Sequence, residues 1–227
     1  VVNGKAKVSW LHGAPARNLK IKSTATLRST STGFDTFPSY NFYDPTRRFE
    51  QVELSLLDGT VNNEGSIPIK TKLSLSKRAP GMLEAAIVTK AYEGGGDFSL
   101  DVITKKVAPF DHFVGIKSPK GRAYGSYYTD QDIAFDLVTT NAQGSPVGKR
   151  KLEVNIYKMS WRWWWNRNRD RYASYESGTA HTPVKQMTIT TDANGKYSLD
   201  VNIPEARNGR YLIRVVDPES GHATGRI

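Results

Sequence analysis

Short runs in which apolar and polar residues alternate recur along almost the whole chain. Alternation over four to eight residues, bounded by Gly, Pro, Asn and Asp, is typical of half-buried β-strands. No sustained helical stripe with capping residues appears. The pattern predicts strands at residues 5–11, 19–27, 49–57, 67–75, 82–92, 98–105, 112–117, 132–139, 152–159, 186–191, 196–203 and 211–216. So many short strands indicate an all-β protein built from antiparallel β-sandwiches.

Turn sequences in the first half of the chain recur in the second half at a nearly constant spacing. Such self-similarity at a fixed period indicates repeated structural units. We therefore predict two copies of one fold, at residues 1–107 and 108–227, joined by a short linker at 106–111 around Pro109. The matching turns are Gly13-Ala14-Pro15 with Gly144-Ser145-Pro146 (offset 131), Asn63-Glu64-Gly65 with Ala193-Asn194-Gly195 (offset 130) and Gly81 with Gly209 (offset 128).

The two copies begin and end at different strands of the common fold. Val8 aligns near Thr139, so the first copy begins at what would be the second strand of the second copy and is expected to lack its first strand. The second copy ends where the first still has a strand at 98–105, so its last strand is expected to be truncated. Either the chain is cut through an edge strand at both ends, or neighbours complete each sheet. We interpret it as an excised piece of a longer protein, because neither end resembles a natural terminus.

Both copies carry an aromatic-rich connection at the same place. The first contains Phe34, Phe37, Tyr40, Phe42 and Tyr43. The second is a predicted Trp-rich hairpin insert at 158–184, whose candidate residues for contact with another domain or a partner are Trp161, Arg162, Trp163, Trp164, Trp165, Arg167 and Arg169.

Two interpretations of the Trp-rich insert stay open. Tryptophans on one face of a strand are typical of packing, either over the end of the sandwich or against a neighbouring domain, which is the interpretation we favour. Eight basic and two acidic residues between Lys149 and Arg171, Arg150 among them, could instead serve recognition. Exposed aromatics among cations are typical of platforms for single-stranded nucleic acid, although no module motif accompanies them and nucleic acid is not the expected partner. Carbohydrate stacking on the tryptophans is a further alternative.

Composition excludes several classes of function. The 227 residues contain no cysteine, which excludes disulfides, a thiol nucleophile and thiolate metal sites. The net charge of +10 is divided equally between the two halves, and no apolar run approaches the ~18 residues of a membrane span. Four scattered histidines offer no metal-ligand spacing. Three Gly- or Asp-containing strings, at 94–97, 192–195 and 217–222, are interpreted as turns, so no catalytic or cofactor site is predicted.

Several of these segments together resemble the macroglobulin-like domains of bacterial alpha-2-macroglobulins. The specific parts are the run Trp161-Arg162-Trp163-Trp164-Trp165 and the turn Asp217-Pro218-Glu219-Ser220-Gly221-His222. They are accompanied by the less specific Gly13-Ala14-Pro15-Ala16, Phe113-Val114-Gly115-Ile116-Lys117, Leu152-Glu153-Val154 and Gly209-Arg210-Tyr211-Leu212-Ile213-Arg214-Val215. The resemblance covers nearly the whole chain and implies two consecutive macroglobulin domains, just upstream of the bait-region domain. Each would be an Ig-like, fibronectin-III-like antiparallel β-sandwich.

The resemblance implies a non-catalytic scaffold within a bacterial endopeptidase inhibitor that entraps proteases after its bait segment is cut. The implied partners are neighbouring macroglobulin and bait-region domains of the same chain, and target proteases through the full-length protein. It also implies a periplasmic location, with a lipid anchor on the parent protein as an option. The family's thioester motif needs a cysteine and is absent here. The competing hypothesis is a tandem Ig-like binding module of a surface adhesin or glycan-binding protein.

Overall fold

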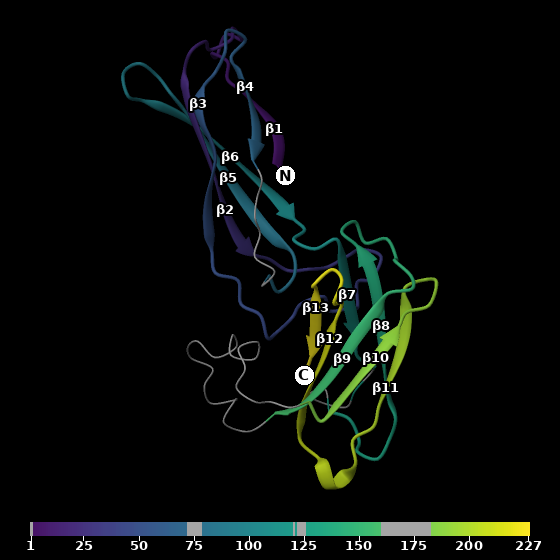
Figure 1. Ribbon diagram of the computed structural model, residues 1–227. Helices are drawn as coiled ribbons and strands as arrows, with labels where there is room; N and C mark the ends of the chain where they lie inside the picture. Colours follow the sequence, from purple (N-terminus) through teal and green to yellow (C-terminus); the bar gives the residue numbers. More distant parts are fainter. Residues whose placement is uncertain (1, 72–78, 120, 122–125, 160–182) are drawn as a thin grey trace. The chain divides into compact units, whose positions relative to one another are not determined.

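The computed structural model describes residues 2–71, 79–119, 121, 126–159 and 183–227 (Figure 1). Within these residues β-strands dominate, and the helical structure is one 3-10 turn at Glu205–Arg207. The predicted all-β fold class is confirmed. By its contacts the chain divides into two units, the first of 1–29, 50–76 and 83–107, and the second of 30–49, 77–82 and 108–227.

The first unit contains a two-stranded and a four-stranded antiparallel sheet. β2 (Lys20–Ser29) alternates between buried and more exposed positions, and its buried residues Ile21, Ala25 and Leu27 form the core side of the larger sheet. The small sheet is β1 (Val2–Lys7) with β4 (Ser66–Thr71). The large sheet runs in the order β3 (Val52–Thr60), β2 (Lys20–Ser29), β5 (Leu83–Tyr92) and β6 (Phe98–Val107).

The second unit is a two-layer sandwich of a three-stranded and a four-stranded antiparallel sheet (Figure 1). One layer is β11 (Lys196–Val201), β8 (Ile133–Asn141) and β7 (His112–Lys117). The other is β10 (Lys185–Thr190), β9 (Lys151–Met159), β12 (Arg210–Val216) and β13 (Ala223–Arg226).

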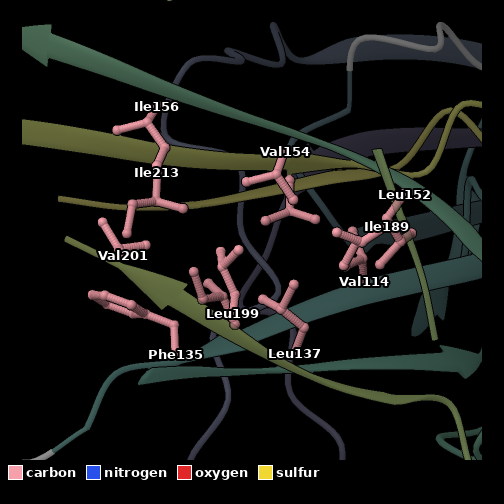
Figure 2. Packing of buried hydrophobic residues seen from close by; sticks show 12 residues of the cluster. Val114, Phe135, Leu137, Leu152, Val154, Ile156, Ile189, Leu199, Val201 and Ile213 are labelled. Carbon is pink, nitrogen blue, oxygen red and sulfur yellow. The ribbon is translucent and has the colours of Figure 1, made fainter. Parts of the chain in front are cut away.

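Apolar side chains from the two layers of the second unit meet in one core (Figure 2). This is why β9 alternates as predicted, with Leu152, Val154 and Ile156 directed inward. Burial of one such side chain stabilises the folded state by roughly 1.5–3 kcal/mol relative to leaving it in water. The cluster consists of Val114, Ile116, Phe135, Leu137, Leu152, Val154, Ile156, Ile189, Leu199, Val201, Ile213 and Val215.

The internal repeat is visible in the hydrogen bonds of the backbone. Val8 N–H donates to Gly65 O at 2.8 Å in the first copy, and Thr139 N–H donates to Gly195 O at 2.8 Å in the second. Gly65 and Gly195 have φ angles of 68° and 73°, and a Cβ on either would lie within 2.7 Å of a backbone oxygen. Both copies therefore need glycine at this place for the same steric reason.

Strand register corrects the third of the predicted offsets. Ala25 lies opposite Ile87 and Ile156 lies opposite Ile213. At the offset of 131 Ala25 corresponds to Ile156, so their partners Ile87 and Ile213 also correspond, at an offset of 126. The pairing of Gly81 with Gly209, at 128, was therefore misaligned by two positions.

The second copy has a last strand where the sequence pattern predicted none. β13 pairs antiparallel with β12 over Ala223–Arg226. The second copy therefore has a strand at the place that β6 occupies in the first copy. Its four residues, Ala-Thr-Gly-Arg, lack apolar alternation, which explains why the pattern missed it. β13 is shorter than the ten-residue β6.

Candidate functional site: a buried anchor for residues 30–49

The aromatic connection between β2 and β3, residues 30–49, belongs to the second unit and packs on β7. The rings of Phe34 and Phe42 meet edge to face with centroids 4.8 Å apart, and Phe34 meets Phe113 of β7 at 5.5 Å. Phe42 is fully buried. A Cβ on Gly115 would lie 2.5 Å from the Phe42 ring, so glycine lets this ring approach the backbone of β7.

Residues 41–43 lie between β7 and β13 and bond to both strands. Asn41 and Ile116 exchange backbone hydrogen bonds of 2.8 and 2.9 Å on the β7 side. On the β13 side, Gly225 N–H donates to Tyr43 O at 3.1 Å and the Asn41 amide Nδ2 donates to Gly225 O at 2.8 Å. This short stretch therefore connects the facing edges of the two sheets of the second unit.

Asp44, the next residue, is a fully buried carboxylate surrounded by donors. Arg214 of β12 donates to it from Nε (3.2 Å) and Nη2 (2.9 Å), and Arg47 Nε lies 3.3 Å away. Thr46 donates from its backbone N–H (2.9 Å) and its hydroxyl (2.7 Å). Burial alone would raise the pKa of Asp44, but the Arg214 charge and these hydrogen bonds outweigh burial and hold that pKa below its ordinary value.

A second buried ion pair joins the start of β9 to the turn after β12. The guanidinium of Arg150 donates from Nε and Nη2 to both carboxylate oxygens of Asp217, at 2.8–3.1 Å, and from Nη1 to Glu219 at 2.8 Å. Asp217 also accepts the backbone N–H groups of Glu219 and Ser220. The predicted turn at 217–222 is confirmed, and its leading carboxylate is held by an arginine in a forked geometry.

That turn places His222 in the centre of the anchor. Its Nδ1 accepts the Val114 N–H at 3.0 Å and its Nε2 lies 3.1 Å from Phe42 O, so the neutral Nε2–H tautomer satisfies both partners. The rings of Phe110 and Phe113 pack on it at 5.0 and 4.7 Å. Burial lowers the pKa of His222 to about 3, more than the Phe42 carbonyl and nearby carboxylates offset.

This segment anchor, defined as Asp44, Arg150, Arg214, Asp217 and His222, has no group available for acid–base or nucleophilic chemistry. Each carboxylate is bonded to arginine and both ring nitrogens of the histidine are engaged. Across the ranges that the structure describes, His, Asp and Glu side chains do not gather in a group that could hold a metal ion. In the same ranges no helix is long and apolar enough to cross a membrane. The arrangement can fix a segment in place.

The candidate contact residues predicted from sequence, Trp161, Arg162, Trp163, Trp164, Trp165, Arg167 and Arg169, lie outside the described residues. Arg150, which the sequence grouped with the basic residues around that insert, is instead buried and paired with Asp217. Sequence reasoning missed Asp44 and Arg214, which are 170 positions apart. The available signal was an Asp-Pro pair, at 44–45 and again at 217–218, where each aspartate begins a turn.

Two family models match the chain in succession. The bacterial alpha-2-macroglobulin MG5 domain matches residues 2–109, and bacterial macroglobulin domain 6 matches residues 115–227.

Relatives from two enterobacteria match along nearly the whole chain. An alpha-2-macroglobulin homolog of Yersinia pestis is 29% identical over 97% of this chain, and alpha-2-macroglobulin of Escherichia coli K12 is 22% identical over 96%. The chain spans only 11% and 14% of the length of these curated relatives. The crystal structure of trypsin-activated Escherichia coli alpha-2-macroglobulin shares the fold, with a TM-score of 0.61 at 17% identity over 99% of this chain and 15% of that one.

Proposed function

This chain belongs to the bacterial alpha-2-macroglobulin family as a tandem of macroglobulin domains 5 and 6, and we propose that it is a non-catalytic scaffold of an endopeptidase inhibitor. The observation that supports this role is the succession of the two domain models along one chain. In the proposed mechanism a protease cleaves a bait segment elsewhere in the full-length protein, which then rearranges and cages the protease. The domains described here hold their neighbours in position during that change.

The segment anchor gives this scaffold its physical basis. The Asp44–Arg214 ion pair and the neutral buried His222, which contacts Phe42 O and Val114 N–H, hold residues 30–49 in place through directional bonds as well as apolar contact. The proposed partners are neighbouring macroglobulin and bait-region domains and, through the whole protein, proteases; the proposed location is the periplasm.

The Trp-rich insert is proposed to contact a neighbouring domain. β2 ends at Ser29 and β9 ends at Met159, so at the offset of 131 the two connections begin at corresponding places. The first connection packs by its aromatic residues on a sandwich other than the one whose strands flank it. The same topological place in the second copy carries Trp161, Trp163, Trp164 and Trp165. The two domain models favour this scaffold role over the adhesin or glycan-binding alternative.

Trapping is tested on the intact protein with trypsin and two substrates. A caged protease keeps its activity on a small peptide amide, because the amide diffuses into the cage, but loses activity on casein. We expect an excess of the intact protein to reduce casein cleavage severalfold while amide cleavage stays near its starting rate. Equal inhibition of both substrates would indicate active-site blockage, and no inhibition of either would remove the trapping role.

A further inference from the structure

The strand β6 of the first unit is a long exposed edge. It pairs with β5 on one side and stands last in its sheet. Nine of its ten residues are exposed, including a row of Phe98, Leu100 and Val102 on one face and Ile103 on the other. Proteins ordinarily cover, shorten or charge such an edge, because its open backbone groups pair readily with another strand. β6 carries charges at Asp101, Lys105 and Lys106, but the row of Phe98, Leu100 and Val102 carries none, and an exposed apolar row on an open edge indicates a surface that another segment covers.

Strand register identifies the counterpart of this edge in the second unit. Ile87 corresponds to Ile213, as derived from the repeat, and these residues lie opposite Ile103 and Arg226 respectively. Residues 100–103 of β6 therefore occupy the place of β13, residues 223–226. The two edges differ sharply in exposure: Ala223, Thr224 and Gly225 are buried, whereas Leu100 and Val102 are about half exposed, at 55% and 52%.

The structure shows what covers β13. Tyr43 O accepts the Gly225 N–H at 3.1 Å, and the Thr224 hydroxyl donates to Asn41 O at 2.8 Å. Pro45 then passes over the outer face, where a Cβ on Gly225 would lie 2.8 Å from its Cδ. The covering segment, residues 41–45, comes from the aromatic connection of the other copy of the fold.

We propose that β6 is the docking edge for the corresponding connection of another domain of the same fold in the same polypeptide. The segment would lie along residues 100–103 in extended conformation, bonded to their backbone as residues 41–43 are bonded to β13. The proposal rests on the proposed scaffold function, in which domains of this fold follow one another.

The residues around β6 define the chemistry of its occupant. Arg214, which binds Asp44 in the second unit, corresponds to Val88, and Gly225 corresponds to Val102. Val88 offers no cation at the place of Arg214, and Lys90, which lies opposite Leu100 on the same face, has its Nζ 4.7 Å from the centroid of the Phe98 ring. The desolvation of a buried aspartate would therefore be poorly compensated here. The occupant therefore carries an apolar residue in place of Asp44 and lies against Val88, Leu100 and Val102 through apolar contact.

Hydrogen exchange of the intact protein, read by mass spectrometry with fragmentation that resolves residues 98–107, tests the proposal. On a bare edge the amides that face away from β5 exchange fast, whereas a docked segment protects them. We expect those amides at residues 100–103 to be protected, and Val102→Lys to increase their exchange by about tenfold or more, since a lysine on an edge opposes strand addition. Leu100→Lys provides a second variant, and thermal melting checks that both are folded.

Val52→Lys is the matched control, because Val52 lies on β3, the opposite edge of the same sheet, with 40% exposure. It should leave exchange at β6 unchanged. Fast exchange of the outward amides in the wild-type protein overturns the proposal. Protection that appears only at high protein concentration, with dimers in sedimentation that Val102→Lys abolishes, also overturns it, in favour of a second copy. The casein and peptide-amide assay on the same samples tests the trapping function independently. Loss of casein cleavage with an unprotected β6 would mean that the docking proposal fails while the trapping function stands.

Discussion

The Nδ1 atom of His222 accepts the backbone N–H of Val114 at 3.0 Å, and this bond requires an unprotonated nitrogen. The Nε2 atom lies 3.1 Å from the carbonyl of Phe42, which needs a hydrogen on that side. His222 therefore connects β7, the aromatic connection and the turn before β13 only in its neutral form. Protonation of His222 places a hydrogen on Nδ1, which then faces the Val114 N–H instead of accepting from it. It also creates a positive charge at a fully buried position.

The pH dependence of stability should report this histidine. Its folded pKa, about 3, lies below its ordinary value of 6.5, so the unfolded chain binds a proton that the folded chain does not. His222 therefore lowers the free energy of unfolding as the pH falls below 6.5, and the loss continues down to about pH 3. Between pH 7.5 and 5 the expected loss is about 2 kcal/mol in urea unfolding. Asp44, whose pKa lies below its ordinary value of 3.8, lowers the stability at more acidic pH than this comparison uses.

His222→Gln is the variant that isolates this effect, because a glutamine amide can donate to Phe42 O and does not titrate. The absolute stability falls, but most of the difference in unfolding free energy between neutral and mildly acidic pH should disappear. His12→Gln, at an exposed position, is the control and should retain the difference. An unchanged pH difference in the His222 variant would show that other groups cause it.

The pair Asp44–Arg214 should be strongly coupled in stability. Asp44 is fully buried and the Arg214 side chain is 13% exposed, so removal of one partner takes two charge-assisted hydrogen bonds from a largely desolvated charge. We expect Asp44→Ala and Arg214→Ala each to lower the free energy of unfolding by about 3–5 kcal/mol, and the double variant to lose much less than their sum. The same cycle on the exposed pair Lys22–Asp58 should give about 1 kcal/mol or less. Additive losses at Asp44 and Arg214 would contradict a direct interaction.

The alternation of apolar residues was sufficient to predict most of the strands, because it reflects which side chains face the core. β7 was predicted at its observed limits, 112–117, since Val114 and Ile116 point into the sandwich and Phe113 into the aromatic cluster. β13 was missed because its small and polar residues are buried by a segment distant in sequence, which periodicity does not register. Local pattern thus predicts a strand only where the strand supplies its own apolar face.

The segment anchor could not be predicted for a related reason. Asp44 and Arg214, like Arg150 and Asp217, are ordinary charged residues in sequence, and only the fold brings each pair together over 170 and 67 positions. Counting charges placed Arg150 in a basic patch, whereas its guanidinium is buried against a carboxylate. The resemblance to macroglobulin domains identified the turn at 217–222 but not what the turn holds.

The Trp-rich insert should resist proteolysis in the intact protein if it packs on a neighbouring domain. Exposed loop tips with small or polar residues are the preferred sites of nicking, and the predicted return arm, residues 173–179, has that composition. We expect an unspecific protease at low dose to cleave elsewhere first. Replacement of Trp161, Trp163 and Trp165 by alanine should expose the insert and accelerate cleavage between Arg167 and Thr182. Rapid single-site cleavage there in the wild-type protein would contradict the packed interpretation.

Gly115 should not tolerate a side chain, because its place on β7 is set by the ring of Phe42. A Cβ would lie 2.5 Å from Cε1 and 2.7 Å from Cζ of a ring that is fully buried and flanked by Phe34. The ring cannot retreat without disturbing that contact, so Gly115→Ala is expected to cost about 1–3 kcal/mol of unfolding free energy. Gly94→Ala, at a turn with nothing within 4 Å, is the matched control and should change stability by about 0.5 kcal/mol or less. Equal stabilities of the two variants would mean that the aromatic connection does not pack against β7 in solution, and the anchor of residues 30–49 would lose its main apolar contact.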